Sequence, residues 1–171
     1  MQQLTATNLK QLLDDPEYHS PSIDGVLYDR NTIRPSVVHF GVGNFHRCHQ
    51  AVYMDKLHRR GSDAWGIIGI SMRSTNTRSA LKPQDFLYTE VTLGEEVSFR
   101  IIGSILDILV APQDPGAVVK LVAERSTKLV TTTITEKGYY LSSGNIDYSH
   151  TDMSADEASL RKPKTIYGYL A

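Results

Sequence analysis

The fold is decided by residues 37–70, which read VVHFGVGNFHRCHQAVYMDKLHRRGSDAWGIIGI. The opening VVHF is a short run of bulky side chains that stops at Gly-Val-Gly, as a buried strand does before a tight turn. Residues 46–60 then repeat apolar side chains at helical spacing, with Gly61 as the expected stop. Residues 65–70 are a second apolar run of the buried-strand type. This order of strand, glycine loop, helix and strand predicts a parallel sheet with a right-handed crossover.

The segments that follow extend this sheet and insert a hairpin. Residues 86–93 and 97–102 alternate apolar and polar side chains around Gly-Glu-Glu, which predicts a β-hairpin. Residues 105–110 and 128–135 are further candidate strands. Between them, residues 112–124 carry an apolar stripe behind Asp-Pro, which is typical of a capped helix start. We therefore expect an α/β, Rossmann-like fold: a mostly parallel sheet with helices on both faces and an inserted β-hairpin.

The two ends of the chain differ from this central pattern. Residues 7–13 predict a short helix, and the polar residues 16–35 predict an extended arm over the surface. Residues 141–163 are polar and loop-like. Residues 165–171 begin a new apolar element at which the chain ends. We expect the side chains of this last element to lack partners, as they would in a truncated chain.

The bulk composition is that of an ordinary globular domain. The chain has 171 residues, of which 40% are hydrophobic and 22% charged, with a net charge of −1. A nucleic-acid-binding protein usually carries a basic excess, so we expect no nucleic-acid partner. No apolar run approaches the roughly 20 residues that cross a bilayer, so we expect no membrane association. The single cysteine, Cys48, suits a reducing compartment, and we expect a soluble, cytoplasmic protein.

The glycine loop is the first part of a dinucleotide-binding fingerprint. Gly41 stands where the tight turn is made, and Gly43 where the backbone approaches a pyrophosphate at a helix start. His46 takes the place of the third glycine of the usual pattern. Arg47, beside the helix start, is suited to a bidentate phosphate contact. A strand-to-helix turn without a ligand is the alternative, and the local sequence leaves both open.

The tip of the second strand, residues 71–76, reads SMRSTN and contains no acid. An acid at this position normally binds the ribose hydroxyls of adenosine. Asn76 is able to hydrogen-bond a ribose hydroxyl, and Arg73 is able to pair with a 2′-phosphate or to stack on adenine. The alternative for Arg73 is a solvated surface charge. The sequence therefore leaves the choice between NAD and NADP open.

Two polar residues follow the last predicted strand. Glu136 lies outside a strand end, where open α/β folds gather ligands. It either relays protons to water, helps to close the nicotinamide end of the pocket, or forms an ion pair with Lys137 or another surface cation. Thr135 either binds the cofactor or simply suits a strand. His46 and His49 lie three residues apart, but no clear third ligand is nearby, and we expect no metal site.

Four ordered motifs resemble the long-chain mannitol dehydrogenase family, which includes mannitol 2-dehydrogenases and fructuronate reductases. They are HFGVGNFHRCHQAVY at 39–53, RS at 73–74 leading to PQDFLY at 83–88, VAPQDP at 110–115 and TITEKGY at 133–139. The resemblance runs from residue 37 to the end of the chain. The tip SMRSTN departs from those members that carry an acid there, which puts a strict preference for NAD in doubt.

The resemblance implies one half of a two-domain oxidoreductase. The chain would comprise an N-terminal helix and arm (1–35) and a dinucleotide-binding domain (36–171), while a helical catalytic domain with a lysine as general acid/base is absent. The implied reaction is hydride transfer between NAD, or NADP, and a secondary alcohol of mannitol, fructose or a fructuronate-like substrate. No catalytic residue is expected in this chain, apart from the relay suggested for Glu136, so the chain alone is expected to be inactive.

The residues expected to bind the cofactor are Phe40, Gly41, Val42, Gly43, Asn44, Phe45, His46, Arg47, Arg73, Asn76 and Thr135. A different function remains open beside this one. In this second hypothesis the chain is a non-catalytic fragment that binds a nucleotide or a protein partner. An exposed apolar patch at residues 166–170 would favour it.

Overall fold

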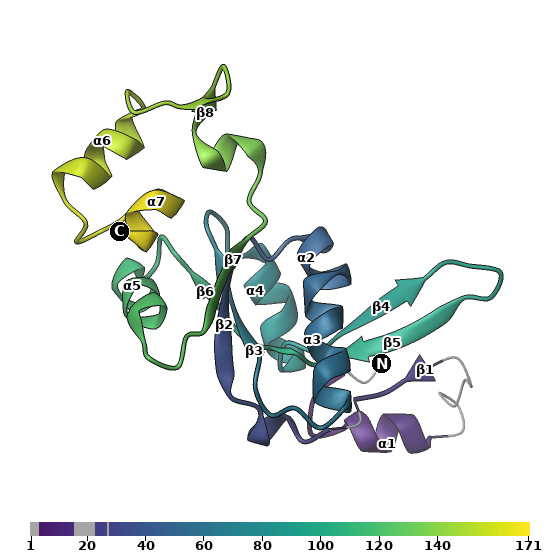
Figure 1. Ribbon diagram of the computed structural model, residues 1–171. Coiled ribbons are helices and arrows are strands. Elements are labelled where there is room, and N and C mark those ends of the chain that lie inside the picture. The colour runs from purple at the N-terminus through teal and green to yellow at the C-terminus, as the bar shows by residue number, and fades with distance from the viewer. Residues whose placement is uncertain (1–3, 16–22, 27) are drawn as a thin grey trace.

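A four-stranded parallel sheet forms the centre of the molecule (Figure 1). The computed structural model describes residues 4–15, 23–26 and 28–171. Every neighbouring pair in the sheet is parallel, and the strand order is β6-β3-β2-β7. Its strands are β2 (Pro35–Phe40), β3 (Gly66–Ser71), β6 (Ile105–Val110) and β7 (Leu129–Thr132). The chain moves outward from β2 to β3 and β6 and then returns to the other side of β2, which is the strand order of a Rossmann half.

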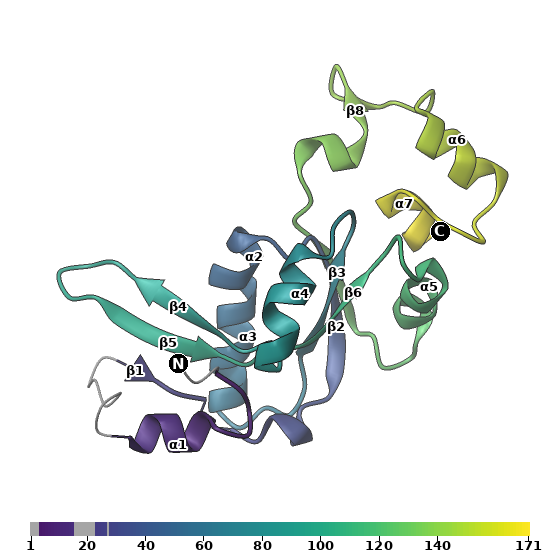
Figure 2. The same cartoon turned by 180° about the vertical axis from the view of Figure 1, so that it is seen from behind.

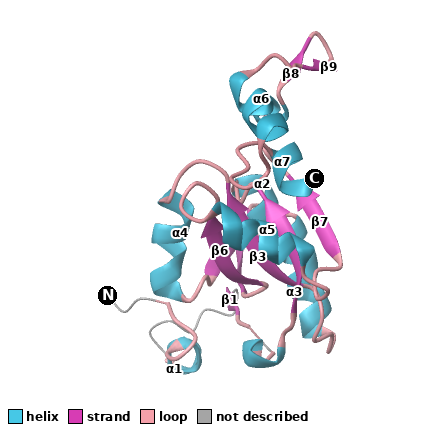
Figure 3. Cartoon of the chain, turned by 90° about the vertical axis from the view of Figure 1, so that its left-hand side faces the viewer, coloured by secondary structure: helices cyan, strands magenta, loops and turns pink. Residues whose placement is uncertain are grey.

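Helices cover both faces of this sheet, as predicted (Figures 1 and 3). One face carries α2 (Asn44–Cys48), α3 (Gln50–Arg59) and α4 (Asn76–Leu81), and the other carries α5 (Pro115–Ala123) and α7 (Ile166–Leu170). Alternation along β2 explains the two layers, because successive side chains of a strand point to opposite faces. Val37 packs into the cluster beneath α3, whereas Val38 and Phe40 pack beneath α5 and α7. The predicted α/β class is therefore confirmed.

A second sheet projects from the body of the molecule (Figure 2). β4 (Tyr88–Thr92) and β5 (Ser98–Ile102) form the predicted antiparallel hairpin. The short strand β1 (Ile23–Asp24) pairs with β5 in parallel. Helix α1 (Leu9–Asp14) packs against the base of this sheet through Leu9. The helix predicted at residues 7–13 therefore exists, with its start at Leu9.

The N-terminal arm is joined to the body by a buried carboxylate. Of the predicted arm, residues 16–22 and 27 lie outside the described residues. The side chain of Asp55 in α3 is fully buried. It accepts hydrogen bonds from Tyr28 Oη at 2.6 Å, Arg59 Nε at 2.6 Å and Gly103 N at 3.0 Å. Burial, together with Asp55, raises the pKa of the Tyr28 hydroxyl, which therefore stays protonated and donates.

The single helix predicted over residues 46–60 is divided in two. α2 ends at Cys48 and α3 begins at Gln50, while His49 between them has φ −129° and ψ −86°. The break coincides with a tertiary contact, because the Arg47 carbonyl accepts a hydrogen bond from the Tyr88 hydroxyl at 2.7 Å. A side chain that enters the helical hydrogen-bond ladder is a recognised cause of a kink. The prediction of one helix was wrong because periodicity carries no information about such a distant partner.

Several other elements are shorter than predicted. β7 covers Leu129–Thr132 within the predicted 128–135, and α5 begins at Pro115. The predicted cap of α5 is confirmed, since the Asp114 carboxylate accepts a hydrogen bond from Ala117 N at 2.9 Å. No helix in the described part of the chain has the length and apolar character that a membrane span requires.

The loop predicted over residues 141–163 contains regular structure. It includes β8 (Leu141–Ser142), β9 (Asn145–Ile146) and α6 (Thr151–Ala158). The one buried residue of α6 is Asp156, whose carboxylate accepts hydrogen bonds from Lys164 N at 2.8 Å, Thr165 N at 2.9 Å and the Thr165 hydroxyl at 2.7 Å. A polar anchor therefore holds this helix in place of an apolar stripe. The prediction was wrong because hydrophobic periodicity cannot detect such a helix.

The terminal apolar element is α7, and its main side chains have partners. Ile166 is 3% exposed and Tyr169 is 4% exposed, in a cluster with Phe40 and Val118. The rings of Phe40 and Tyr169 have centroids 5.8 Å apart, and the Tyr169 hydroxyl donates to Ala111 O at 3.3 Å. The expectation of unpartnered side chains was therefore wrong. The apolar patch that would favour a partner-binding fragment is correspondingly reduced.

Candidate functional site

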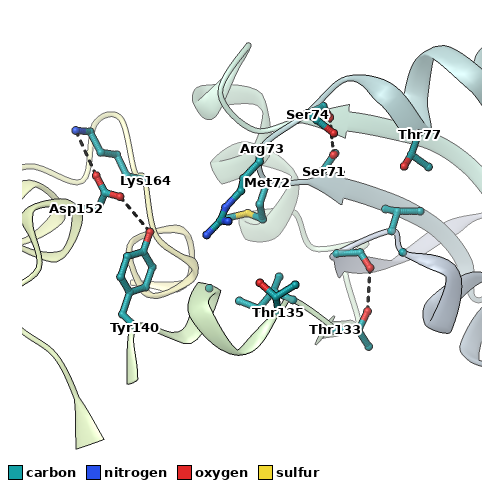
Figure 4. A pocket seen from close by; sticks show the side chains of 15 residues that line it. Ser71, Met72, Arg73, Ser74, Thr77, Thr133, Thr135, Tyr140, Asp152 and Lys164 are labelled. Carbon is teal, nitrogen blue, oxygen red and sulfur yellow. Dashed lines mark hydrogen bonds and ion pairs between the residues drawn. The ribbon is translucent and has the colours of Figure 1, made fainter. Parts of the chain in front are cut away.

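A cavity of about 540 Å³ opens at the carboxyl ends of β2, β3 and β7 (Figure 4). Open α/β folds bind ligands at this edge, where the strand order changes direction. Three parts of the chain surround the cavity. They are the loop after β2 (residues 41–43), the tip of β3 (71–74, with Thr77) and the chain beyond β7 (133–135, with Gly138, Tyr140, Asp152 and Lys164).

The protein's own structure requires glycine at the first of the two loop positions, Gly41, but not at the second, Gly43. Gly41 has φ +101°, and a Cβ there would lie 2.7 Å from Thr133 O and 3.0 Å from Ile134 N. Glycine is therefore required at Gly41 by the close approach of β2 to the end of β7. Gly43 has φ −83° and caps α2, and a Cβ there would meet no heavy atom within 4 Å. Because the protein itself does not need glycine at Gly43, the open space in front of its backbone is suited to a ligand.

Neighbouring side chains hold the loop in place. Val42 is 5% exposed and lies over Gly69 of β3, where a Cβ would be 2.5 Å from Val42 Cγ2. Arg47 donates from Nη1 to Val42 O at 2.9 Å and from Nη2 to Asn44 Oδ1 at 2.5 Å. The Arg47 guanidinium thus fixes the loop. A phosphate contact by the same group stays a prediction.

Two buried histidines lie beneath the loop. The rings of His39 and His46 are stacked with centroids 3.5 Å apart. His39 Nε2 lies 2.8 Å from Thr133 Oγ1 and 3.2 Å from Gly41 O, and its Nδ1 lies 2.7 Å from Thr131 Oγ1. Neither ring nitrogen of His46 has a hydrogen-bond partner among the residues that the structure describes.

Burial keeps both histidines neutral. Burial lowers the pKa of His39 to about 4. Burial, followed by the nearby His39, lowers the pKa of His46 to about 3. At pH 7 both rings are therefore neutral, and His39 contacts Gly41 O and Thr133 Oγ1 without placing a charge beneath the loop.

The tip of β3 forms the second side of the cavity. The Ser71 hydroxyl donates to Ser74 O at 2.7 Å and closes the turn. Arg73 is exposed and extends into the cavity (Figure 4). Asn76, predicted to bind a ribose, is the first residue of α4 and does not line the cavity. Its proposed contact stays a prediction.

The third side is a polar group from the C-terminal part of the chain. The Tyr140 hydroxyl donates to Asp152 Oδ2 at 3.2 Å, and Lys164 Nζ lies 3.7 Å from Asp152 Oδ1 (Figure 4). Burial and the Asp152 carboxylate raise the pKa of Tyr140, although Arg73 opposes this shift. The sequence did not single out these three residues. They lie far apart in the sequence, and only the tertiary fold brings them together.

The predicted cofactor residues divide into two groups. Those that line the cavity are Gly41, Val42, Gly43, Arg73 and Thr135; those that do not are Phe40, Asn44, Phe45, His46, Arg47 and Asn76. The Phe40 side chain is fully buried in the core beneath α5, so only its backbone remains available for the predicted contact. Glu136 is exposed at the start of the turn after β7 and does not line the cavity, so its relay role also stays a prediction.

The histidines considered as metal ligands have other contacts. His46 stacks on His39, whereas His49 stacks on Phe45 at 5.0 Å between ring centroids and meets Tyr53 edge-on at 5.1 Å. Among the described residues, no group of three His, Cys, Asp or Glu side chains is arranged to hold a metal ion.

The strand order, the glycine loop and the cavity at the point of reversal define this chain as a domain of the Rossmann type. A sequence model described as "Mannitol dehydrogenase Rossmann domain" matches residues 35–171. The chain belongs to the mannitol dehydrogenase family, and the family predicted from the four motifs is confirmed.

Individual relatives agree with this membership. A mannitol 2-dehydrogenase of Pyrenophora tritici-repentis is 39% identical over 149 residues, covering 84% of this chain and 26% of the relative. A polyol:NADP oxidoreductase of Gluconobacter oxydans is 37% identical over 151 residues, covering 84% of this chain and 31% of the relative. The solved ternary complex of Pseudomonas fluorescens mannitol 2-dehydrogenase with NAD and D-mannitol matches with a TM-score of 0.87 and 34% identity. That match covers 98% of this chain and 34% of the solved one, so the chain spans about a third of the length of its relatives or less.

Proposed function

We propose that this chain binds a nicotinamide adenine dinucleotide in the cavity at the carboxyl ends of β2, β3 and β7. It would form the cofactor-binding half of an oxidoreductase that transfers a hydride between NAD, or its 2′-phosphorylated form, and a secondary alcohol of mannitol, fructose or a fructuronate-like substrate. The observation that carries this proposal is Gly43, whose backbone faces open space at the helix start that follows β2.

The residues present suit such a cofactor. Gly43 leaves room for a pyrophosphate to approach the backbone, and a first helical turn leaves N–H groups without partners inside the helix. Arg47 and the His39–His46 pair keep the loop in one conformation, so little ordering is needed on binding. The bound nicotinamide would supply the hydride chemistry itself.

Thr133 and Thr135 border the same cavity from the end of β7. The Thr133 hydroxyl donates to Gly41 O at 2.8 Å, so it acts in this proposal as a support of the turn. Thr135 is exposed and would contact the cofactor directly. Glu136, next in sequence, is the candidate for relaying protons to solvent.

Catalytic turnover would then require a protein as long as the relatives. The relatives extend well beyond the part matched by this chain, and two of them are described as acting on mannitol or polyols. The catalytic base and much of the substrate pocket would then come from a further, C-terminal domain, and the chain alone would bind cofactor without catalysis. We further propose the division into an arm (1–35) and a cofactor domain (36–171), and a cytoplasmic location that suits the single Cys48.

Titration of NADH into the chain, followed by nicotinamide fluorescence, tests the proposal. We expect saturable binding that is lost in Gly43→Asp, because the new carboxylate would face the pyrophosphate. Aspartate is a favourable N-cap, so this variant should fold normally by circular dichroism. The matched control is Gly94→Asp, which adds the same charge at the exposed turn of the β4–β5 hairpin, away from the cavity. A folded chain that binds neither NADH nor NADPH, or a Gly43→Asp variant that binds normally, would contradict the proposal.

A further inference from the structure

The side of the cavity formed by β3 lacks the group that binds an unmodified ribose. In Rossmann folds a carboxylate near this strand end accepts hydrogen bonds from the ribose hydroxyls, whereas an arginine accommodates a 2′-phosphate. Residues 71–77 here read SMRSTNT and contain neither Asp nor Glu. The side chains offered to the cavity at this tip come from Ser71, Met72, Arg73, Ser74 and Thr77. This wall therefore supplies hydroxyl groups and one cation.

Arg73 is available to a ligand. It is exposed and extends into the cavity toward the side formed by Tyr140 (Figure 4). Within the described residues, no hydrogen bond or ion pair engages its guanidinium, in contrast to Arg47, which is bound to the loop. A planar guanidinium without a protein partner is suited to bidentate recognition of a phosphate.

The other charges of the cavity do not oppose an anion. The Asp152 carboxylate is already engaged by the Tyr140 hydroxyl at 3.2 Å and by Lys164 Nζ at 3.7 Å. With two cations, Arg73 and Lys164, against one carboxylate, the formal charge of the charged side chains that line the cavity is +1. A monoester phosphate carries about −1.5 to −2 at pH 7 and would find a favourable field here.

We infer that this cavity selects the 2′-phosphorylated cofactor, NADP(H), and that Arg73 is the residue that determines this specificity. The inference rests on the proposed function. In it, the Arg73 guanidinium pairs with the 2′-phosphate, and the Ser74 and Thr77 hydroxyls line the same cavity. If Arg73 instead stacked on adenine, both cofactors would gain equally, since both carry the same base.

Calorimetric titration of the chain with NADPH and NADH tests the inference, with 2′,5′-ADP and 5′-AMP as smaller probes that differ in the same phosphate. We expect NADPH and 2′,5′-ADP to bind at least about tenfold more tightly than NADH and 5′-AMP at low salt. The difference should shrink as salt is raised, because the contact is exposed to solvent. Arg73→Ala should remove the difference because it weakens NADPH binding far more than NADH binding, and Arg73→Lys should retain part of the difference.

Arg125→Ala is the matched control, since Arg125 is another exposed arginine that does not line the cavity, and it should change nothing. Equal or tighter binding of NADH by the native chain would overturn the inference. So would an equal loss of both cofactors in Arg73→Ala, which would indicate adenine stacking, or a preference for NADPH that survives the substitution. If the chain binds NADH well without preferring NADPH, the inference fails while the proposed function stands. If it binds none of the four probes, the proposed function fails as well.

Discussion

Replacing Gly41 with alanine is expected to destabilise the folded chain, because the residue occupies a conformation and a space that exclude a side chain. Its φ of +101° lies in the region that L residues avoid, and a Cβ would lie 2.7 Å from Thr133 O and 2.8 Å from Thr133 C. Both atoms belong to the backbone, so the contact cannot be relieved by a rotamer change. The sheet edge between β2 and β7 must shift to accept the methyl group.

The magnitude follows from two contributions. The left-handed conformation costs an alanine about 1–2 kcal/mol. Displacing well-packed atoms adds about 1–3 kcal/mol. Together they predict a loss of about 2–5 kcal/mol in the free energy of unfolding, which is a large fraction of the roughly 5–15 kcal/mol typical of a domain.

Urea denaturation followed by far-ultraviolet circular dichroism measures this loss. The control is Gly43→Ser, since Gly43 has φ −83° and open space around its Cβ position, and serine is a favourable N-cap. We expect Gly43→Ser to keep its stability and to bind NADH more weakly, and Gly41→Ala to lose stability. A Gly41→Ala variant within about 0.5 kcal/mol of the native chain, the range of a neutral surface change, would refute the reasoning.

Three further predictions concern stability. The pKa values of His39 and His46 are lowered to about 4 and about 3, whereas an unfolded histidine titrates near 6.5. Between these values the unfolded chain binds more protons, so stability should fall as pH falls from about 6.5 to about 3, with a shallower decline in His46→Asn. A pH profile of the urea midpoint that stays level across this window would contradict it. Asp156→Ala removes three hydrogen bonds, two of them buried, and should cost about 2–4 kcal/mol in thermal unfolding, with exposed Glu157→Ala as a neutral control. Asp55→Ala removes the buried carboxylate that accepts from Arg59 Nε at 2.6 Å and should cost about 3–5 kcal/mol by urea denaturation. A loss below about 1 kcal/mol would show that the arm is held by other contacts.

The central unit of the fold was predictable because its signals are local. The run at residues 37–40, the glycine loop and the spacing of apolar side chains after it lie within one short stretch of chain. The left-handed conformation of Gly41, with φ +101°, favours glycine by itself, and Asp114 caps α5 from three residues away. The hairpin around residues 94–96 follows from its turn residues in the same way.

The features that were missed depend on partners far away in sequence. The break at His49 coincides with a hydrogen bond from Tyr88 to Arg47 O, and α6 is anchored by a carboxylate that reaches Thr165. The burial of Tyr169 beneath the sheet likewise depends on Phe40. No pattern within a window of a dozen residues contains these pairs.

The features of the candidate site also divide into those that are local in the sequence and those that depend on distant contacts. The loop at Gly41 and Gly43 and the acid-free tip that carries Arg73 can be located from the sequence alone, because each lies directly at the end of a predictable strand. The contact of Arg47 with the loop, and the third side of the cavity formed by Tyr140 and Asp152, become visible only in the folded chain. The physical reason is that strand ends and turns follow from the conformational limits of neighbouring residues, whereas the partner of a charged side chain is chosen by which distant segments the packed sheet brings within hydrogen-bond distance.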